Sequence, residues 1–552
     1  MEEAIQYYLP RPLYALTTII NRLDSLNLTA ERRRALTALI LVACDAGNTM
    51  WGYPAERPRP KQLNTPNQFR EHNVWLELER GLGLWTETAV EVACVAWPNK
   101  LPDQGGICIY EGRLKDLSHE VKKEIPITAV ITSLPRPNQA FWTLSALWAG
   151  WLWGRTGVEP YKIALRRRRY DWAWNATALH SAFSHLFELV ALGTPVFGLL
   201  PEVEPSFVTS ALTAASAAGL DLKGMALRTD HDPLQVVWTR GEHLKRQGAQ
   251  PDIEVVRDAM IDHLTERGEP ATYLHLHTAA LISLNELHAL KQPDQEFDAA
   301  LRATHALIER ALLDDPQFLH HSTGEGVEAG LWGWSAWDAE LGPTTRPRDS
   351  LSDRVEIASV TFLQKNPDSI FLEIENQLYR EFQGLFTPSK GIIYAVLYSY
   401  AFKEGARWKL RPQDTAMRRR EDLSEMSSLL EAIGKRLKYK TRKRDRTLIW
   451  EENGKPVRVF SLLASALVGR AIAETRDTPG QTILVIPGGR AGLVAYKVQR
   501  DPSLAKHLRE CRIAKYRFVR ALSEIPILTR ETMEEQIASD PVEEATDQMM
   551  MF

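Results

Sequence analysis

Apolar residues recur three or four positions apart near the start of the chain, between Leu13 and Leu23 and again between Leu36 and Cys44. Positions with this spacing share one face of a helix, so the pattern predicts two packed helices between residues 12 and 45. A segment rich in prolines follows, from Tyr53 to Asn73 (YPAERPRPKQLNTPNQFREHN). Because proline interrupts regular hydrogen bonding, this segment is expected to be a loop.

Short β-branched runs alternate with helical segments between residues 126 and 245. The run from Ile127 to Thr132 predicts a strand that ends in a Pro-rich turn, and a Trp-rich helix follows after Asn138. A second helix at about 172–192 leads into the strand TPVFGLL, and a helix at about 206–218 leads into the strands DLKGMALRT and LQVVWT. The order β-α-β-α-β-β predicts the second half of an open, largely parallel α/β sheet that closes with a hairpin.

Helical periodicity dominates the second half of the chain. Residues 246–350 alternate helical segments with Pro and Gly breaks, and the stretch from Gly324 to Pro347 is expected to be a loop. Three helices and a short strand between residues 351 and 411 predict a winged helix. After a helix at about 421–437 come the strands LIW, VRVF and TILVIP, which predict a separate small α/β unit with an acidic tail.

Composition and cysteine usage exclude several classes of protein. The 552 residues are 44% hydrophobic and 25% charged, with a formal net charge of −3, as in an ordinary globular protein of several domains. The four cysteines form no CxxC pair, so neither a disulfide framework nor a metal site is expected. The start of the chain has two acidic residues and no basic n-region before its apolar stretch, so it is not expected to be a signal peptide, and the apolar run from Ala140 to Gly154 is shorter than a membrane span. A cytoplasmic location without membrane contact is therefore expected.

The junction between the first predicted strand and the Trp-rich helix is the leading candidate for a site. Thr132 to Asn138 follow the carboxyl end of the strand, where open α/β sheets place their active sites. The segment TSLPRPNQAFWTLSALWAGWLWG, with TPVFGLL and the closing hairpin, resembles the catalytic part of S-adenosylmethionine-dependent DNA amino-methyltransferases. Those enzymes methylate N6 of adenine or N4 of cytosine. The resemblance thus implies a DNA methylase that works in restriction-modification or phage defence.

The resemblance implies roles for the residues of this junction. The family's loop reads Asp, Asn or Ser, then Pro-Pro, then an aromatic residue. In this chain the four positions fall on Ser133, Leu134, Pro135 and Arg136. By the resemblance, Ser133 accepts a hydrogen bond from the exocyclic amine of the target base and Pro135 shapes the loop, whereas Leu134 replaces a proline.

The base-stacking position is the clearest departure from the family's pattern. Arg136 stands where the family has an aromatic ring that stacks on the flipped base. A guanidinium plane also stacks on bases, and Phe141 or Trp142 on the following helix is expected to supply the ring. The alternative interpretation of the junction is a tight strand-to-helix connection without a catalytic role.

No segment matches the family's glycine-rich cofactor loop, which reads Asp-Pro-Phe-x-Gly-x-Gly. The loop from Pro487 to Gly492 fits neither that motif nor a P-loop, so it is interpreted as a structural turn rather than a nucleotide site. The resemblance extends weakly upstream, through Cys44 to Asn48 and the segments around Arg59 and Phe69. S-adenosylmethionine is therefore expected to bind mainly to a complementary chain that carries the motif. A catalytically inactive DNA-binding or scaffold subunit is the alternative.

Two basic clusters indicate DNA as a partner, because clustered cations neutralise phosphates and give salt-dependent binding. The first cluster is Arg166, Arg167, Arg168 and Arg169. The second is the run from Lys435 to Arg446, in which the candidates are Lys438, Lys440, Arg442, Lys443 and Arg444. A solvated helix end is an equally good interpretation of each cluster. The third helix of the predicted winged helix, from Lys390 to Phe402, is expected to contact either a DNA groove or a protein.

The fold class expected from these patterns is α/β: a partial Rossmann-like methyltransferase sheet with a helical N-terminal region, followed by a winged-helix and a small α/β domain. WKLRPQD and LVIPGGRAGLVAYKVQRDP also resemble the accessory region of large bacterial DNA methylases. The expected domains are residues 1–125, helical with a Pro-rich loop; 126–245, the methyltransferase-like half-domain; 246–350, a helical connector; 351–415, winged-helix-like; and 416–552, α/β with the basic run and the acidic tail.

Overall fold

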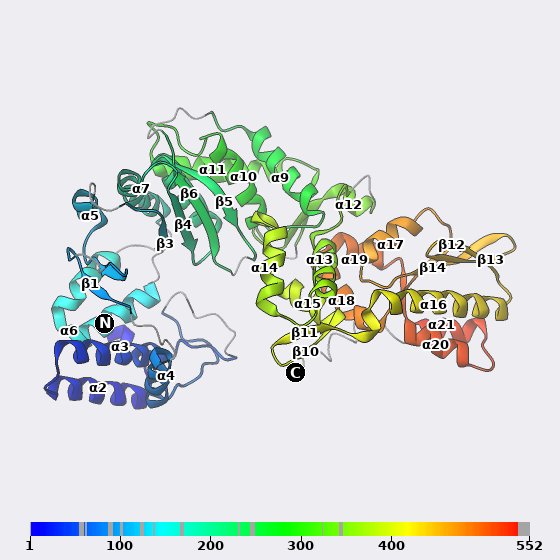
Figure 1. Cartoon of the computed structure of the whole chain (residues 1–552). Helices are drawn as coiled ribbons and strands as arrows, with labels where there is room; N and C mark the ends of the chain where they lie inside the picture. Colours follow the sequence, from blue (N-terminus) through cyan, green and yellow to red (C-terminus); the bar gives the residue numbers. More distant parts are fainter. Residues whose placement is uncertain are drawn as a thin grey trace. The chain divides into compact units, whose positions relative to one another are not determined.

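The computed structural model of the chain divides into two units (Figure 1). Unit 1 contains Met1–Ile125 and Leu134–Ala178, and unit 2 contains Pro126–Ser133 and Leu179–Phe552. The structure describes residues 2–54, 60, 63–86, 92–99, 103–121, 126–135, 139–165, 171–229, 232–242, 249–322, 324–341 and 346–538.

Unit 1 is mainly helical, and the two predicted N-terminal helices are confirmed as α2 and α3. Thr29 caps α3 by accepting a hydrogen bond from the Arg32 N–H. The indole N–H of Trp148 donates to the Tyr8 hydroxyl at 2.6 Å, and this hydroxyl donates to the Cys44 carbonyl at 2.8 Å, inside the core of the unit. The elements are α1 (Glu2–Ile5), α2 (Pro10–Ser25), α3 (Ala30–Ala46), α4 (Val74–Thr86), β1 (Cys94–Ala96), β2 (Ile107–Ile109), α5 (Leu114–Val121) and α6 (Gln139–Leu165).

A four-stranded sheet opens unit 2, with the order β3-β4-β6-β5. Its elements are β3 (Val130–Ser133), β4 (Pro195–Leu200), β5 (Leu220–Ala226) and β6 (Leu234–Arg240), with the helices α7 (Trp172–Leu189) and α8 (Pro205–Ala217). Strands β3 and β4 are parallel, and β6 runs antiparallel to both β4 and β5. Three strands therefore point the same way, as the sequence predicted, and the closing hairpin places β6 between β4 and β5.

One face of this sheet is buried. Val196, Val236 and Trp238 alternate with more exposed neighbours along their strands, which is the period-two pattern of a strand covered on one side. Trp238 packs against Phe183 of α7, with 5.4 Å between ring centroids, and α8 packs on β5. The opposite face near β3 exposes Ile131 and Phe197, which becomes important for the candidate site.

The helical connector predicted after the sheet is present, but one part of it was predicted wrongly. The helices are α9 (Ile253–Arg267), α10 (Tyr273–Glu286) and α11 (Phe297–Leu313). The expected loop from 324 to 347 instead contains β8 (Leu331–Trp334), paired with β7 (Phe318–His321), and α12 (Ser335–Ala339). Pairing with the preceding strand β7 overrides the local glycine signal, and the Trp332 ring stacks on the His320 ring with 4.1 Å between ring centroids.

Three helices and a small antiparallel sheet follow, in the predicted place. They are α13 (Leu351–Lys365), β9 (Ser369–Ile370), α14 (Phe371–Glu381), η1 (Gly384–Phe386), α15 (Lys390–Tyr400), β10 (Ala401–Glu404) and β11 (Arg407–Leu410). Ser389 caps α15 by accepting from the Ile392 N–H. The strand order is β10-β11-β9, so the single strand expected from sequence is part of a hairpin with one further short partner.

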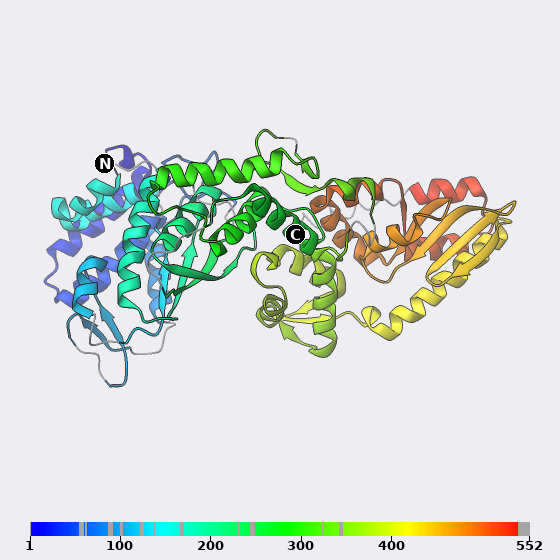
Figure 2. The same cartoon turned by 90° about the horizontal axis from the view of Figure 1, so that it is seen from above.

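A five-stranded sheet with the order β12-β13-β14-β15-β16 forms the C-terminal part, and α16 runs alongside it (Figure 2). Strands β14, β15 and β16 are parallel, whereas β12 and β13 form antiparallel pairs. The elements are η2 (Pro412–Asp414), α16 (Ala416–Arg436), β12 (Lys440–Arg444), β13 (Thr447–Glu452), β14 (Lys455–Leu462), α17 (Val468–Thr475), β15 (Gln481–Ile486), η3 (Gly488–Arg490), α18 (Ala491–Arg500), α19 (Pro502–Leu508), β16 (Arg512–Lys515), α20 (Tyr516–Glu524) and α21 (Arg530–Ala538).

One hydrophobic core joins the three-helix segment to this C-terminal part. Val355, Ile374 and Val396 belong to the same buried cluster as Leu484 and Val494. Within the described residues, no helix has both the length and the apolar character that a membrane span requires.

Buried histidines of the connector make stability depend on pH. Burial lowers the pKa of His263 to about 3, and His275 and His277 shift in the same direction for the same reason. The folded state thus holds these rings neutral, whereas the unfolded chain protonates them near pH 6.5.

We expect the free energy of unfolding to be highest above pH 6.5 and to fall as the pH drops toward 3, by up to about 1.4 kcal/mol per pH unit for each histidine. Urea unfolding between pH 5 and 8 measures this slope. The variant His277→Gln should show a shallower slope, and an identical slope in both proteins would contradict the assignment.

Candidate functional site

Ser133 is the last residue of β3 and lies at the carboxyl end of a parallel strand pair. Its register partner is Leu199 of β4, and its hydroxyl lies 3.5 Å from the Leu199 carbonyl oxygen, which accepts the hydrogen bond. The side chain is exposed. Because β3 and β4 are parallel, both strands deliver their loops to the same edge of the sheet, which is where the sequence placed the site.

The residues after Ser133 belong to unit 1. Leu134 is only 3% exposed, so its apolar side chain takes part in packing and is closed to a ligand. Pro135 is exposed, and its carbonyl accepts a hydrogen bond of 3.5 Å from the Asn175 side-chain amide on α7. The sequence prediction missed Asn175, which lies in the first turn of a helix opened by Asp171 and Trp172. Arg136 lies outside the described residues.

The two aromatic candidates, Phe141 and Trp142, lie near the start of α6. Phe141 is 47% exposed and meets Trp148 edge-on with 6.2 Å between ring centroids, whereas Trp142 is half-buried. An exposed ring supported by a second aromatic ring is suited to stacking on a planar group. Of the two rings, Phe141 is therefore the one that is more accessible to a ligand.

Strand β3 lies at the end of its sheet, and an apolar surface continues from it. Ile131 is 85% exposed, and Phe197 and Leu199 on the neighbouring strand are also exposed. A sheet of this α/β type is normally covered on both faces, and an end strand carries unpaired N–H and C=O groups along its free edge. Among the described residues of unit 2, no strand pairs with the outer edge of β3, and the face that carries Ile131 is exposed beside Ser133.

This edge of the sheet does not make up a complete S-adenosylmethionine site. The described residues after β3, β4 and β5 read LP, PEVEP and LRT, and none of these segments contains a glycine-rich turn. Without such a turn, backbone N–H groups cannot approach the cofactor closely, so these residues do not fit the group. Nor do the described residues gather three His, Cys, Asp or Glu side chains in a metal-binding cluster.

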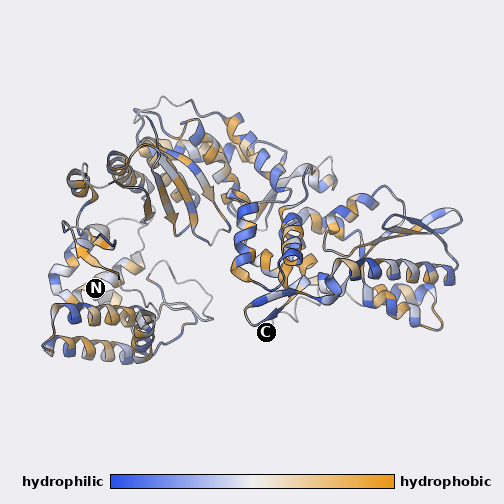
Figure 3. Ribbon diagram, viewed as in Figure 1, coloured by the Kyte–Doolittle hydropathy of each residue, from blue (hydrophilic) through white to orange (hydrophobic). Residues whose placement is uncertain are grey.

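The basic candidates of the C-terminal part lie on and beside an edge strand. Lys440, Arg442, Lys443 and Arg444 belong to β12, and Lys438 occupies the preceding turn with a φ of 64°. All five side chains are exposed, and Figure 3 shows the hydrophilic character of this strand. Lys435 and Arg436 begin the basic run in the last turn of α16, whereas the five candidate residues lie beyond the helix, on an edge strand and in the turn before it. Arg166 to Arg169 lie outside the described residues.

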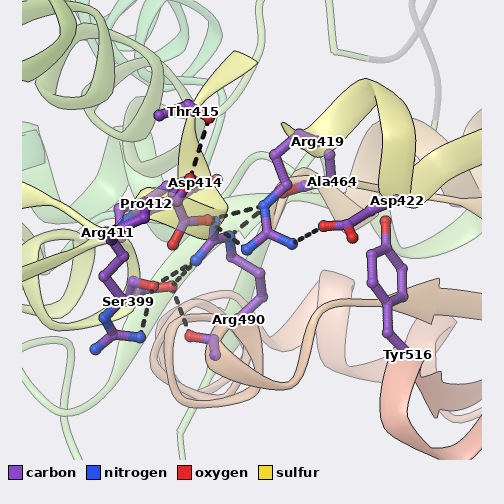
Figure 4. A network of polar contacts seen from close by, with 12 residues as sticks. Ser399, Arg411, Pro412, Asp414, Thr415, Arg419, Asp422, Ala464, Arg490 and Tyr516 are labelled. Atoms are coloured by element: carbon purple, nitrogen blue, oxygen red, sulfur yellow. Dashed lines mark hydrogen bonds and ion pairs between the residues drawn. The ribbon is translucent and has the colours of Figure 1, made fainter. Parts of the chain in front are cut away.

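A buried arginine network near the loop at 487–492 was missed by the sequence prediction (Figure 4). Arg490 is wholly buried and donates to the Asp414 carboxylate and to the Ser399 carbonyl, while its guanidinium lies 3.3 Å from the Tyr400 ring centroid. Arg419 donates to the same carboxylate at 2.9 Å. Two features of the sequence could have indicated this network. They are the arginine in PGGR, which follows the carboxyl end of a buried strand, and the three consecutive arginines in MRRR.

Burial shifts the pKa of Tyr400, whose ring lies against the Arg490 guanidinium in this network. Burial raises the pKa of the Tyr400 hydroxyl well above its usual range, and the Glu356 carboxylate beside it acts in the same direction. Tyr400 consequently stays protonated and donates its hydrogen bond to Glu356. The Nζ atom of Lys497 on α18 lies 2.5 Å from a carboxylate oxygen of Glu356 and from one of Asp353, both on α13. Buried ion pairs thus join the two helices.

Comparison of the chain with protein-family models, curated proteins and solved structures found no match.

Replacing Arg490 by methionine should lower the free energy of unfolding by about 3 kcal/mol, because it leaves Asp414 buried with one ion-pair partner fewer. The control Arg470→Met removes an exposed pair with Glu474 and should cost less than about 0.5 kcal/mol. Denaturant unfolding followed by circular dichroism measures both. If both substitutions lowered the free energy of unfolding by the same amount, the buried ion pair would contribute no more to stability than the surface pair.

Proposed function

We propose that the chain is the target-base part of an S-adenosylmethionine-dependent DNA amino-methyltransferase, in a restriction-modification or phage-defence system. The observation that carries the proposal is the position of Ser133 at the carboxyl end of β3, in a sheet of the order β3-β4-β6-β5. Ligands of open α/β sheets bind outside the carboxyl ends of the strands. The closing hairpin of this sheet also agrees with the resemblance.

Ser133 orients the amine of a flipped adenine or cytosine in this proposal. Its exposed hydroxyl makes only a long contact with the Leu199 carbonyl, so its oxygen lone pairs are available to accept the amine N–H. Pro135 restricts the loop that follows, and Phe141 with Arg136 contacts the face of the base. Holding the base in one orientation is a large part of what such a site contributes to rate.

A separate chain supplies the cofactor site in this proposal. Two observations support it: the described loops at the sheet edge do not fit the cofactor, and Ile131, Phe197 and Leu199 remain exposed beside an unpaired edge strand. A complementary chain that carries the glycine-rich motif would cover apolar surface and complete the sheet.

DNA contacts are assigned to β12 and to the segment from α13 to β11, which we propose to be a winged helix. Its third helix, α15, exposes Tyr394 and Tyr398 one turn apart rather than a row of cations. The phosphate contacts are therefore assigned mainly to the five basic side chains from Lys438 to Arg444.

A catalytically inactive DNA-binding or scaffold subunit is the second candidate. It is favoured by the buried Leu134 where the family has a proline, and by Arg136 where the family has an aromatic residue. The two candidates differ in what they require of Ser133, since only an active enzyme needs its hydroxyl.

Ser133→Ala should lower methyl transfer by about 100-fold, because it removes the hydrogen bond that orients the amine. The measurement is transfer of tritiated methyl groups to DNA by the chain co-expressed with the product of the neighbouring upstream reading frame. DNA affinity should be unchanged. The control Thr239→Val alters a residue at the opposite end of the same sheet and should leave the rate unchanged.

Full activity of Ser133→Ala would exclude the assigned role, and absence of methylation in the wild-type mixture would favour the inactive subunit. Tight binding of S-adenosylmethionine by the chain alone, in a calorimetric titration, would contradict the need for a complementary chain.

Replacing Lys440, Arg442, Lys443 and Arg444 together by glutamine should weaken DNA binding. The slope of log affinity against log salt should become shallower by about 0.9 for each side chain that contacts a phosphate. Fluorescence anisotropy with a labelled duplex at several salt concentrations measures it. Arg302→Gln on α11, an exposed arginine of another element, is the control, and an unchanged slope in the quadruple variant would remove β12 from the interface.

A further inference from the structure

A pocket of about 410 Å³ lies in the C-terminal part of unit 2, beside the loop that follows β15. Six arginines and three carboxylates line it, so positive side chains outnumber negative ones by three. The arginines are Arg411, Arg418, Arg419, Arg490, Arg517 and Arg520, and the carboxylates are Asp414, Asp422 and Glu425. This volume is in the range of small-ligand pockets.

The backbone around the pocket suits an anion. Strand β15 is fully buried over its last four residues and ends at Ile486, and the exposed Gly488 and Gly489 then line the pocket directly before α18 begins. A side chain at Gly488 would meet no atom within 4 Å, so there is open space beside this turn for an incoming group. N–H groups at the start of a helix attract negative charge.

The inner arginines are held rigidly. Arg490 is fixed by Asp414 and by the Ser399 carbonyl. Arg411 donates to the carbonyls of Tyr398 at 2.7 Å and of Ala401 at 3.1 Å, at the end of α15. Its hydrogen bonds therefore go to neutral carbonyl groups, and its charge remains to be balanced by another group. Rigid donors lose little conformational freedom when they bind a ligand.

The outer arginines are exposed and form surface ion pairs. The Arg418 side chain is 58% exposed and pairs with Glu421 at 2.9 Å. The Arg520 side chain is 41% exposed and donates two hydrogen bonds to Glu425, at 2.9 and 2.8 Å, and a third to Asp422 at 3.3 Å. Arg517 is exposed as well. The single pair of Arg418 is worth at most about 1 kcal/mol, so a phosphate can replace Glu421, whereas its carboxylate partners hold Arg520 in place at the rim.

One buried oxygen points to a ligand with a hydrogen-bond donor. The Oδ1 atom of Asp414 accepts from both Arg490 and Arg419, but its Oδ2 atom is buried and accepts no hydrogen bond. A buried acceptor without a donor is costly, and a ligand with a hydroxyl or amino group beside its anionic group would satisfy it. Nucleotides have both groups.

We propose that this pocket binds the phosphate of a nucleotide or of a nucleic-acid strand. A network that served only to join α15, α16 and β15 would need Arg490 and Arg419, whereas this pocket gathers six arginines against three carboxylates. The proposal does not depend on the methyltransferase assignment, because the pocket belongs to a different sheet from Ser133.

The double variant Arg418→Gln/Arg517→Gln tests the proposal, and because both side chains are exposed, thermal unfolding should match the wild type. The probes are adenosine diphosphate, inorganic pyrophosphate and a 5′-phosphorylated single-stranded DNA of about 12 nucleotides. We expect wild type to bind at least one probe by calorimetry at low salt, and the double variant to bind it at least about tenfold more weakly. Arg302→Gln, on α11, should bind as the wild type does.

The pattern of binding identifies the source of the phosphate. Binding of the diphosphates assigns the pocket to a nucleotide, whereas binding of the DNA alone, weakened in the double variant, assigns it to a nucleic-acid strand. Wild-type protein that binds none of the probes at about 1 mM, or a double variant that binds as tightly as wild type, would overturn the proposal.

Discussion

The buried ion pair between Arg490 and Asp414 is the interaction on which the second unit most depends. Arg490 has no exposed surface, and a guanidinium removed from water is tolerated only when its hydrogen bonds are well made. Its partners come from η2 and from the end of α15, so the network fixes the start of α16 and the loop after β15 in one arrangement. The pair of Lys497 with Asp353 and Glu356 adds a second fixed point between α13 and α18.

Elements with a strong local signal were predictable from sequence. The β-branched run at 127–132 overlaps β3, which begins at Val130, and the TPVFGLL segment contains β4; the apolar spacing from Leu36 to Cys44 indicated the helix α3. Two strands whose own residues carry no strand pattern were not. Strand β8 forms by pairing with the preceding strand β7, and β12 is a strand despite its charges because it pairs with the following strand β13 along five residues. A charged edge strand has no hydrophobic alternation for a sequence reading to detect.

The candidate site also combines features that were predictable from sequence with features that were not. The position of Ser133 at the end of a predicted strand was enough to place it at the carboxyl edge of a sheet, because parallel strands end at the same edge and ligands bind there. The burial of Leu134 and the hydrogen bond from Asn175 to Pro135 depend on which helix packs over the loop, and no local pattern encodes that choice. The arginine pocket was also out of reach, since its lining comes from three separate segments spread over about 110 residues, from Arg411 to Arg520.

Helix α16 sets a distance between the two positively charged regions of the C-terminal part. Its 21 residues begin beside Arg418 and Arg419 and end just before Lys438 and β12, which at 1.5 Å per residue is about 31 Å. In the DNA complex proposed above, this length would span roughly nine base pairs at about 3.4 Å each, a little less than one helical turn. A straight duplex presents nearly the same side to two points one turn apart. The rigid length of α16 would thus decide which phosphates of the duplex the two regions can contact together.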